Sequence, residues 1–434
     1  MQKFTEPFVV NTIDGLKAPK SQSRDLLIDW IFEDEDLRRF LHQQGAECAW
    51  MLSDQNAFLQ FLKVSLDRYF ESGEATIAPD EQYARIGEYA SEFNRISTRF
   101  APSTKPNPEA VFWPDPTQGG AKLQDVLPVA VTHPFIDHGS RIGSAGSCFA
   151  IEIAQNLMSR GFNYICQETT YDAETETIVM GTSPEDPVVQ YSCRWGILFN
   201  TPSFTQIVEN AFGVRPLPPL LVRYELGNEI VYLDPYRENV MFKSPDAYMV
   251  EREKHAANTR AVFENADVFV MTLGLNEAWQ YLPDGTYISR NPRNKNLNGL
   301  LTHRTLSVEE NIDYLQRFVD VVRAHNPNIK LVVTVSPVPF LATGRADEYH
   351  VITANGHSKA VLRVAAQEIV ERNENVFYFP SYEVVTVCSP EIWTEDQRHV
   401  HPDAIRRVMA TFDEMFLTDE AKAKVQAASA AGEA

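Results

Sequence analysis

The sequence predicts an α/β fold, a three-layer α/β/α sandwich around a mostly parallel sheet, preceded by a helical N-terminal segment. From about residue 140 onward, strand-like apolar runs alternate with helix-like periodic segments, an order typical of βαβ units. The run from Val268 to Leu273 is almost wholly apolar, as in strands that are buried on both faces. Residues 1–100 contain helical patterns instead and form a separate segment.

The N-terminal 100 residues are polar-rich, and their apolar side chains recur at helical spacing. The recurring positions are Leu26, Leu27, Trp30, Ile31, Phe58, Phe61, Leu62 and Leu66. No catalytic pattern accompanies them, so residues 1–100 are interpreted as a helical extension, a cap or an interaction module. Residues 101–135 are interpreted as a Pro-rich linker or strap, because proline fixes φ and removes backbone donors.

The main domain is predicted to span residues 136–417. Ser307 and Glu310 form a capping-box pattern at the start of a helix. Further expected elements are strands at 329–335 and 376–379, helices at 355–372 and 402–416, and hairpins that turn at Gly227-Asn228 and Pro283-Asp284-Gly285. The first hairpin belongs to an expected insertion near 214–245, and residues 418–434 form an Ala-rich tail, expected to be a frayed helix or disordered.

Composition excludes several classes of function. The net charge is −20 and the pI is about 5.0, which argue against nucleic acid or an anionic membrane surface as the partner. The start of the sequence has no signal-peptide pattern, and no uncharged apolar run approaches the roughly 20 residues that span a bilayer. The expected location is therefore the cytoplasm.

The five cysteines are widely spaced and include no C-x-x-C pair, which fits neither a disulfide scaffold nor a zinc site. Of these, Cys166, Cys193 and Cys388 are expected in the core. Motifs for a phosphate-binding loop, a dinucleotide site, a G-x-S-x-G elbow and an H-E-x-x-H zinc site are all absent. The sequence therefore predicts no metal and no bound cofactor.

Three motifs able to carry chemistry follow predicted strands or precede the last helix. They are Gly146-Ser147-Cys148, Gly274-Leu275-Asn276 and Asp396-Gln397-Arg398-His399. Open α/β sheets place their sites at the carboxyl edge, so the three motifs are expected to meet there.

The residue types fit acyl transfer. Cys148 would open a helix, whose N-terminal dipole favours thiolate over thiol. His399 supplies a base near neutrality, and Asp396 can orient its ring. Asn276 can donate to an oxyanion, a contribution of roughly 3–4 kcal/mol, with the backbone N–H of Cys148 as a second donor.

Several alternatives stay open at this point. Ser147 is the rival nucleophile, although an N-cap role is favoured for it. His401 is the rival base, with a surface or capping role as its alternative. Lys359 and Arg363, one helical turn apart, can bind a substrate carboxylate or phosphate, but a solvated helix face is the favoured interpretation.

Gly-Ser-Cys-Phe-Ala at 146–150 is the signature of the GSCFA-domain family, which this chain resembles over roughly residues 110–417. Other matching stretches are Gly196-Ile-Leu-Phe-Asn200, Thr272-Leu-Gly-Leu-Asn-Glu-Ala-Trp279, Val335-Ser-Pro-Val-Pro339, Ser358-Lys-Ala-Val-Leu-Arg363 and Tyr378-Phe-Pro-Ser-Tyr-Glu383. The family in turn resembles the SGNH/GDSL hydrolases, and that resemblance implies an SGNH-like fold. Carried over, it places Cys148 at the nucleophilic serine and Ser147 at the Asp of the Gly-Asp-Ser turn.

The same resemblance matches Asn276 to the oxyanion asparagine, within the Gly274-x-Asn276 motif, and Gly196 to the oxyanion glycine. It matches Asp396 and His399 to the catalytic pair. The resemblance implies an ester hydrolase or an O-acyltransferase acting on a glycan or a small acylated metabolite, with a role in polysaccharide biosynthesis and acyl-CoA as a candidate co-substrate. The alternative is a non-catalytic binding or scaffold module that uses the same cleft. The sequence leaves the oligomeric state open.

Overall fold

The computed structural model describes residues 27–45, 55–73, 78–97, 99, 101–237, 239–289, 297 and 299–432. The chain divides into two compact units, Met1–Val111 and Phe112–Ala434. The first contains helices α2 (Glu35–Gly45), α3 (Gln55–Glu71) and α4 (Pro79–Ser97). Their apolar side chains, which include Phe58 and Leu62, form one small core together with Phe32, which precedes α2.

Short 3-10 turns occupy the Pro-rich stretch. Three of them begin at a proline: η2 (Pro102–Thr104), η3 (Pro108–Ala110) and η4 (Pro116–Gln118); η5 (Leu123–Asp125) follows. Proline suits the first helical position because its missing N–H would be unpaired there anyway.

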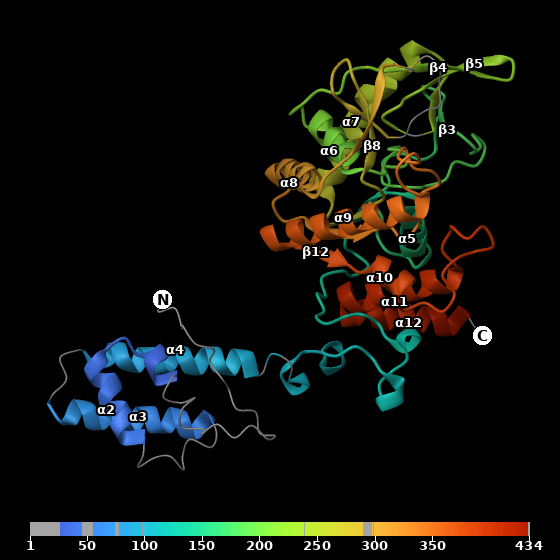
Figure 1. Cartoon of the computed structure of the whole chain (residues 1–434). Coiled ribbons are helices and arrows are strands. Elements are labelled where there is room, and N and C mark those ends of the chain that lie inside the picture. Colours follow the sequence, from blue (N-terminus) through green and yellow to red (C-terminus); the bar gives the residue numbers. More distant parts are fainter. Residues whose placement is uncertain are drawn as a thin grey trace. The chain divides into compact units, whose positions relative to one another are not determined.

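A parallel sheet is the centre of the second unit (Figure 1). Its order is β1 (Ile142–Gly146), β7 (Val268–Leu273), β11 (Lys330–Val335) and β12 (Val376–Phe379), and every pairing is parallel. The carboxyl ends of these strands therefore share one edge. The registers set Gly146 beside Thr272 and Val335 beside Leu273.

Helices cover both faces of this sheet. Alternate side chains of its central strands point to opposite faces and enter two different cores, each of which includes a different set of helices. Phe269 and Met271 join a core with α6 (Thr201–Ala211), α7 (Pro245–Asn265), α8 (Val308–His325) and α9 (Val351–Arg372). Val268 and Val270 join a core with α5 (Cys148–Ser159), α10 (Ser381–Thr386), α11 (Pro402–Phe416) and α12 (Asp419–Gly432). The three-layer α/β/α sandwich is confirmed.

Two smaller antiparallel sheets extend the sandwich. One has the order β10 (Leu301–Thr305), β8 (Glu277–Tyr281), β9 (Tyr287–Ile288). The other has the order β2 (Tyr171–Asp172), β3 (Thr177–Val179), β6 (Val240–Phe242), β5 (Glu229–Leu233), β4 (Val222–Leu226). Both predicted hairpins are present, as β4–β5 and β8–β9. The sheet that contains the predicted β4–β5 hairpin is larger than that hairpin, because β2, β3 and β6 also belong to it. Strands β2 and β3 have only two and three residues, which is too short for a periodic pattern in the sequence.

Other local predictions also match. The Ser307/Glu310 capping box is formed, and β12 and α11 have the predicted bounds. The Ala-rich tail is largely helical, as α12, and Ala421 of that helix is buried. Among the helices of the described ranges, none is long and apolar enough to cross a membrane.

Candidate functional site

The turn between β1 and α5 depends on glycine. Gly146 has φ +151°, and a Cβ atom there would lie 2.5 Å from the carbonyl oxygen of Thr272 on β7. Only glycine allows the two strands to approach this closely. Ser147 then takes an extended N-cap conformation, and α5 begins at Cys148. The turn thus places Cys148 at the carboxyl edge of the sheet.

Cys148 and Ser147 have different exposure. Ser147 is only 2% exposed, and its buried Oγ has no hydrogen-bond partner, whereas Cys148 is partly exposed. Ser147 occupies the predicted N-cap position of α5, but its side chain makes no capping hydrogen bond. A reagent from solvent therefore reaches the sulfur of Cys148 more readily than the hydroxyl of Ser147.

Burial dominates the ionisation of Cys148. It raises the pKa of the thiol above its ordinary value. The charges of Arg398 and Lys359 act in the opposite direction, as do the backbone N–H groups of Phe149 and Cys148. Burial and the helix N-terminus thus act in opposite directions on Cys148: the backbone N–H groups at the start of α5 favour thiolate, as expected, and burial favours thiol.

Residues 196–200 join the first two motifs. The N–H of Leu198 donates to the carbonyl of Gly146 at 3.0 Å, and the carbonyl of Phe199 accepts from the N–H groups of Gly274 (3.0 Å) and Leu275 (2.8 Å). A Cβ on Gly274 would lie 2.9 Å from that same carbonyl oxygen, so glycine permits the contact. Gly196, at φ +66°, begins this segment. The turn between β1 and α5, residues 196–200 and the Gly274–Asn276 turn are thus in direct contact.

Asn276 is almost fully buried, at 1% exposure. Its Nδ2 donates to the carbonyl of Leu306 at 3.0 Å, and its backbone N–H donates to Ser358 Oγ at 2.8 Å. The amide oxygen is buried without a partner. One of the two amide hydrogens of Asn276 is therefore already engaged in a hydrogen bond within the fold.

Asp396 and His399 form the expected pair. One oxygen of Asp396 contacts His399 Nδ1, and the other accepts from the backbone N–H groups of Arg398 and His399 and from Thr394 Oγ1. These donors, the His399 N–H foremost, hold the pKa of Asp396 below its ordinary value. Asp396 thus holds the His399 ring through Nδ1.

The His399 ring and Cys148 are not hydrogen-bonded to each other among the contacts of the described residues. The ring is half exposed, and the neighbouring Arg398 is one of the two residues whose charge acts on the thiol. His401 caps α11 by accepting from the N–H of Asp403, and its Nε2 contacts Glu391. The structure thus gives His401 the capping role that was its alternative.

Lys359 is the residue that sequence reasoning misjudged. The predicted solvated face of its helix is wrong, because Lys359 is 1% exposed and its Nζ donates to the carbonyl of Gly274 at 2.7 Å. Arg363 is partly exposed and pairs with Glu383 instead. The only sequence signal was the stretch shared with the family. Of the cysteines expected in the core, Cys193 and Cys388 are buried, but Cys166 is exposed, which corrects that prediction.

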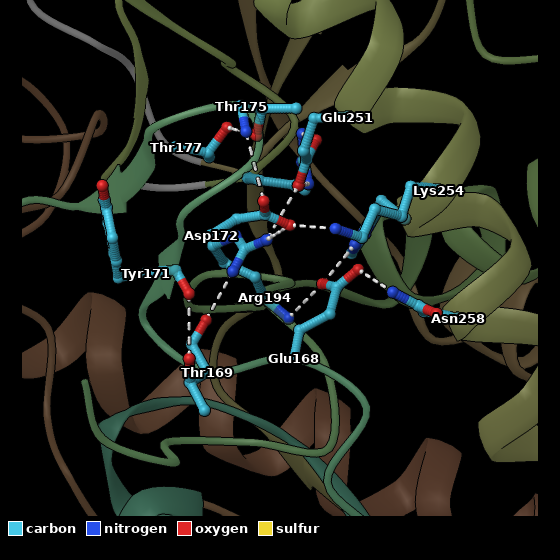
Figure 2. A network of polar contacts seen from close by, with 12 residues as sticks. Glu168, Thr169, Tyr171, Asp172, Thr175, Thr177, Arg194, Glu251, Lys254 and Asn258 are labelled. Carbon is cyan, nitrogen blue, oxygen red and sulfur yellow. Dashed lines mark hydrogen bonds and ion pairs between the residues drawn. The ribbon is translucent and has the colours of Figure 1, made fainter. Parts of the chain in front are cut away.

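A buried polar network supports the loop that precedes Gly196 (Figure 2). The backbone N–H of Arg194 donates to Glu168, and its guanidinium donates to the carbonyl of Thr169 and contacts Glu251 and Asp172. With Arg194 fixed by so many partners, the Gly196 segment has a rigid support next to the nucleophile turn.

Part of this network has the composition of a metal site. Ligand atoms of Glu168, Glu251 and His255 lie within 4.8 Å of one another. Glu251 is already paired with both arms of Arg237, and Glu168 contacts His255 Nδ1 at 2.7 Å. These partners neutralise the carboxylates, so the cluster is interpreted as an ion-pair network that joins α7 to the insertion.

The chain is similar in structure to several proteins of known structure. No curated protein sequence matches it. One similar solved structure is a carbohydrate esterase family 3 protein from Talaromyces cellulolyticus. The match covers 63% of this chain and 94% of that protein, with 10% sequence identity and a TM-score of 0.29. A Clostridium thermocellum family 3 carbohydrate esterase has 12% identity, coverage of 64% and 94%, and a TM-score of 0.28.

A third similar structure is a putative GDSL-like lipase from Parabacteroides merdae, with 14% identity, coverage of 65% and 98%, and a TM-score of 0.27. TM-scores this low carry no argument about activity. The profile of the GSCFA family, in contrast, matches residues 141–412, a span that includes Cys148, Asn276 and the Asp396/His399 pair. Because this match covers more than half of the sequence, the chain belongs to the GSCFA family.

Proposed function

We propose that the protein is an acyl-transfer enzyme of SGNH-like type, an ester hydrolase or an O-acyltransferase, with Cys148 as its nucleophile. The observation that carries the proposal is the contact of the Gly146–Cys148 turn with the Gly274–Asn276 turn, through residues 196–200, at one sheet edge. The hydrogen bonds of Leu198 to Gly146 and of Gly274 to Phe199 join them beside an accessible sulfur. Nucleophile turns and oxyanion donors require this proximity.

The reaction divides into two steps. Cys148 Sγ attacks the acyl carbonyl carbon, its proton passes to His399 Nε2, and the carbonyl oxygen becomes an oxyanion held by Asn276 and the helix N-terminus. The bond to the leaving alcohol or thiol then breaks, and that group takes the proton from His399. Water or an acceptor hydroxyl, deprotonated by His399, cleaves the thioester and restores the thiol.

The substrate class follows from the same chemistry and from the family resemblance. When the Cys148 thiol takes the acyl group from acyl-CoA, one thioester replaces another and the CoA thiol leaves, so the step costs little free energy and acyl-CoA suits the donor role in a transferase. The acceptor or substrate would be a glycan or a small metabolite with a hydroxyl or an ester. The protein supplies all catalytic groups in this scheme, and none of them requires a bound cofactor.

Turnover of p-nitrophenyl acetate and of acetyl-CoA, each with and without a glycan acceptor, tests the proposal. We expect the wild type to release product and Cys148→Ala to lose at least about a thousandfold in kcat/KM. Transfer only with the glycan present identifies a transferase, and acceptor-independent release identifies a hydrolase. Binding of acetylated glycans without turnover of any ester would favour the non-catalytic module.

A further inference from the structure

A pocket in the second unit lies outside the site described above. It is bounded by α6, by α7 and by the residues that join β5 to β6, and none of the candidate catalytic residues lines it. Its volume is about 410 Å³, part of which is open to solvent, and its wall is mainly apolar. Mainly apolar walls with a few placed polar groups are typical of sites for small molecules.

Three polar side chains of α7 line this pocket. Tyr248, Arg252 and His255 are separated by four and three residues, which places them on one face of the helix. Tyr248 and His255 are buried, and Arg252 is partly exposed. One helical face therefore presents a hydroxyl, a guanidinium and an imidazole to the same space.

The His255 ring has one nitrogen engaged and one nitrogen without a partner. Its Nδ1 contacts Glu168 at 2.7 Å, and Glu168 also accepts from Asn258 at 2.8 Å (Figure 2). Its Nε2 is buried, and no described residue hydrogen-bonds to it. Glu168 does not line the pocket, and Nε2 lies across the ring from the Glu168 contact. Nε2 is therefore the nitrogen on the pocket side, and a buried polar atom of this kind requires a partner.

Arg252 and Tyr248 also have donors to spare. Arg252 Nη1 donates to the Tyr248 oxygen at 3.1 Å, and that oxygen also accepts from the backbone N–H of Leu220 at 3.4 Å. The Tyr248 hydroxyl hydrogen and the second amino group of Arg252 have no acceptor within the described part of the chain. Both donors are thus available to a ligand in the pocket.

The charges around the pocket leave one cation uncompensated. Arg237 donates to Asp234 at 2.8 Å and to Glu251 at 2.7 Å, so the carboxylate that lines the pocket is already paired. No carboxylate of the described residues pairs with Arg252. A ligand with a single negative charge balances Arg252, whereas a second negative charge would be repelled by Asp234.

We propose that this pocket binds a small organic monocarboxylate. The carboxylate accepts from the Arg252 guanidinium, from the Tyr248 hydroxyl and from Nε2 of the His255 imidazolium, and its short hydrocarbon chain packs against Ile207 and Leu217. The apolar wall and the single uncompensated cation favour this class of ligand over inorganic phosphate. The inference goes beyond the proposed function and does not depend on it.

The first test follows the methyl NMR signal of Ile207, assigned with Ile207→Val, while sodium butyrate is added at constant ionic strength. We expect a saturable shift in the wild type, and binding at least about tenfold weaker in Arg252→Gln, because a charge-assisted hydrogen bond is lost. Arg260→Gln is the matched control, since Arg260 lies on the same helix but donates to the carbonyl of Ala211 outside the pocket. It should bind butyrate as the wild type does. Equal affinity of folded Arg252→Gln and wild type would overturn the inference.

A comparison of ligands decides the question if Arg252→Gln does not fold, because it needs only the wild type. Butyramide has the shape of butyrate without its charge and should bind at least about tenfold more weakly. Inorganic phosphate should leave the Ile207 signal in place. Equal binding of butyramide, a stronger response to phosphate than to butyrate, or no saturable shift with butyrate would each contradict the proposal. None of these measurements uses turnover, so their outcome is separate from that of the proposed function.

Discussion

Ser147 and Cys148 are neighbours at the start of α5, but their side chains differ in burial. The Ser147 hydroxyl is buried without a partner, whereas the Cys148 sulfur is accessible and lies within the fields of two cations. An unpaired buried hydroxyl destabilises a fold, so its removal costs little. We expect Ser147→Ala to change the free energy of unfolding by less than about 1 kcal/mol and the turnover by less than a fewfold. Denaturant unfolding and ester turnover check this, and a loss equal to that of Cys148→Ala would make Ser147 the nucleophile.

The raised pKa of Cys148 predicts how the proposed reaction depends on His399. At pH 7 the thiol holds its proton, so attack requires His399; as the pH approaches the raised pKa, thiolate forms without help. We therefore expect His399→Ala to lose roughly 10²–10⁴-fold in kcat/KM at pH 7 and the deficit to shrink steadily toward pH 9. His401→Ala is the control and should keep near wild-type activity at each pH. A deficit independent of pH would speak against His399 as the base.

Candidate site residues could be proposed from the sequence where the residue type has few chemical uses. The thiol of Cys148 and the Asp396/His399 pair have few uses, so their spacing sufficed to propose them. Lys359 was missed because a lysine four residues from an arginine on a helix is normally solvated. Its burial depends on the packing of α9 against Gly274, which sequence periodicity does not encode.

At the scale of elements, the close approach of β1 and β7 creates the site. A side chain at Gly146 would meet the Thr272 carbonyl at 2.5 Å and would also require a positive φ. We expect Gly146→Ala to lower the free energy of unfolding by roughly 2–5 kcal/mol, from strain and overpacking together. Gly213→Ala is the matched control, since Gly213 has φ +70° with open space around it, and should cost only about 1 kcal/mol. Equal losses in chemical denaturation would show that the contact with Thr272 is unimportant.

Elements with their own local signals were predictable, and those stabilised by their neighbours were not. The Ser307/Glu310 capping box and the Gly227-Asn228 turn specify a helix start and a hairpin locally. Strands β2 and β3 have only two and three residues. They pair with each other, and β3 also pairs with β6, so their hydrogen bonds come from neighbouring strands. Tertiary pairing, rather than propensity, therefore accounts for the unforeseen part of the insertion.

For the whole molecule, the buried lysine links stability to pH. The pKa of Lys359 falls from its ordinary 10.5 to about 7 in the folded chain. Between these values the unfolded chain holds a proton that the folded chain lacks, so stability rises with pH through this range, by at most about 1.4 kcal/mol per pH unit. The unfolding free energy of wild type minus that of Lys359→Met should grow between pH 7 and 10. Unfolding in guanidinium at several pH values measures this difference in free energy. A difference that stays constant between pH 7 and 10 would mean that the pKa of Lys359 in the folded chain is not lowered.

Trapping the acyl-enzyme tests most directly whether Cys148 is the nucleophile. The wild type is mixed with p-nitrophenyl acetate, quenched in acid within the first turnovers, digested and analysed by mass spectrometry. We expect one acetyl group on Cys148, removed by hydroxylamine as a thioester, and its accumulation in His399→Ala, where deacylation is slow. Acetyl on Ser147, or steady turnover with Cys148 never acetylated, would contradict the account.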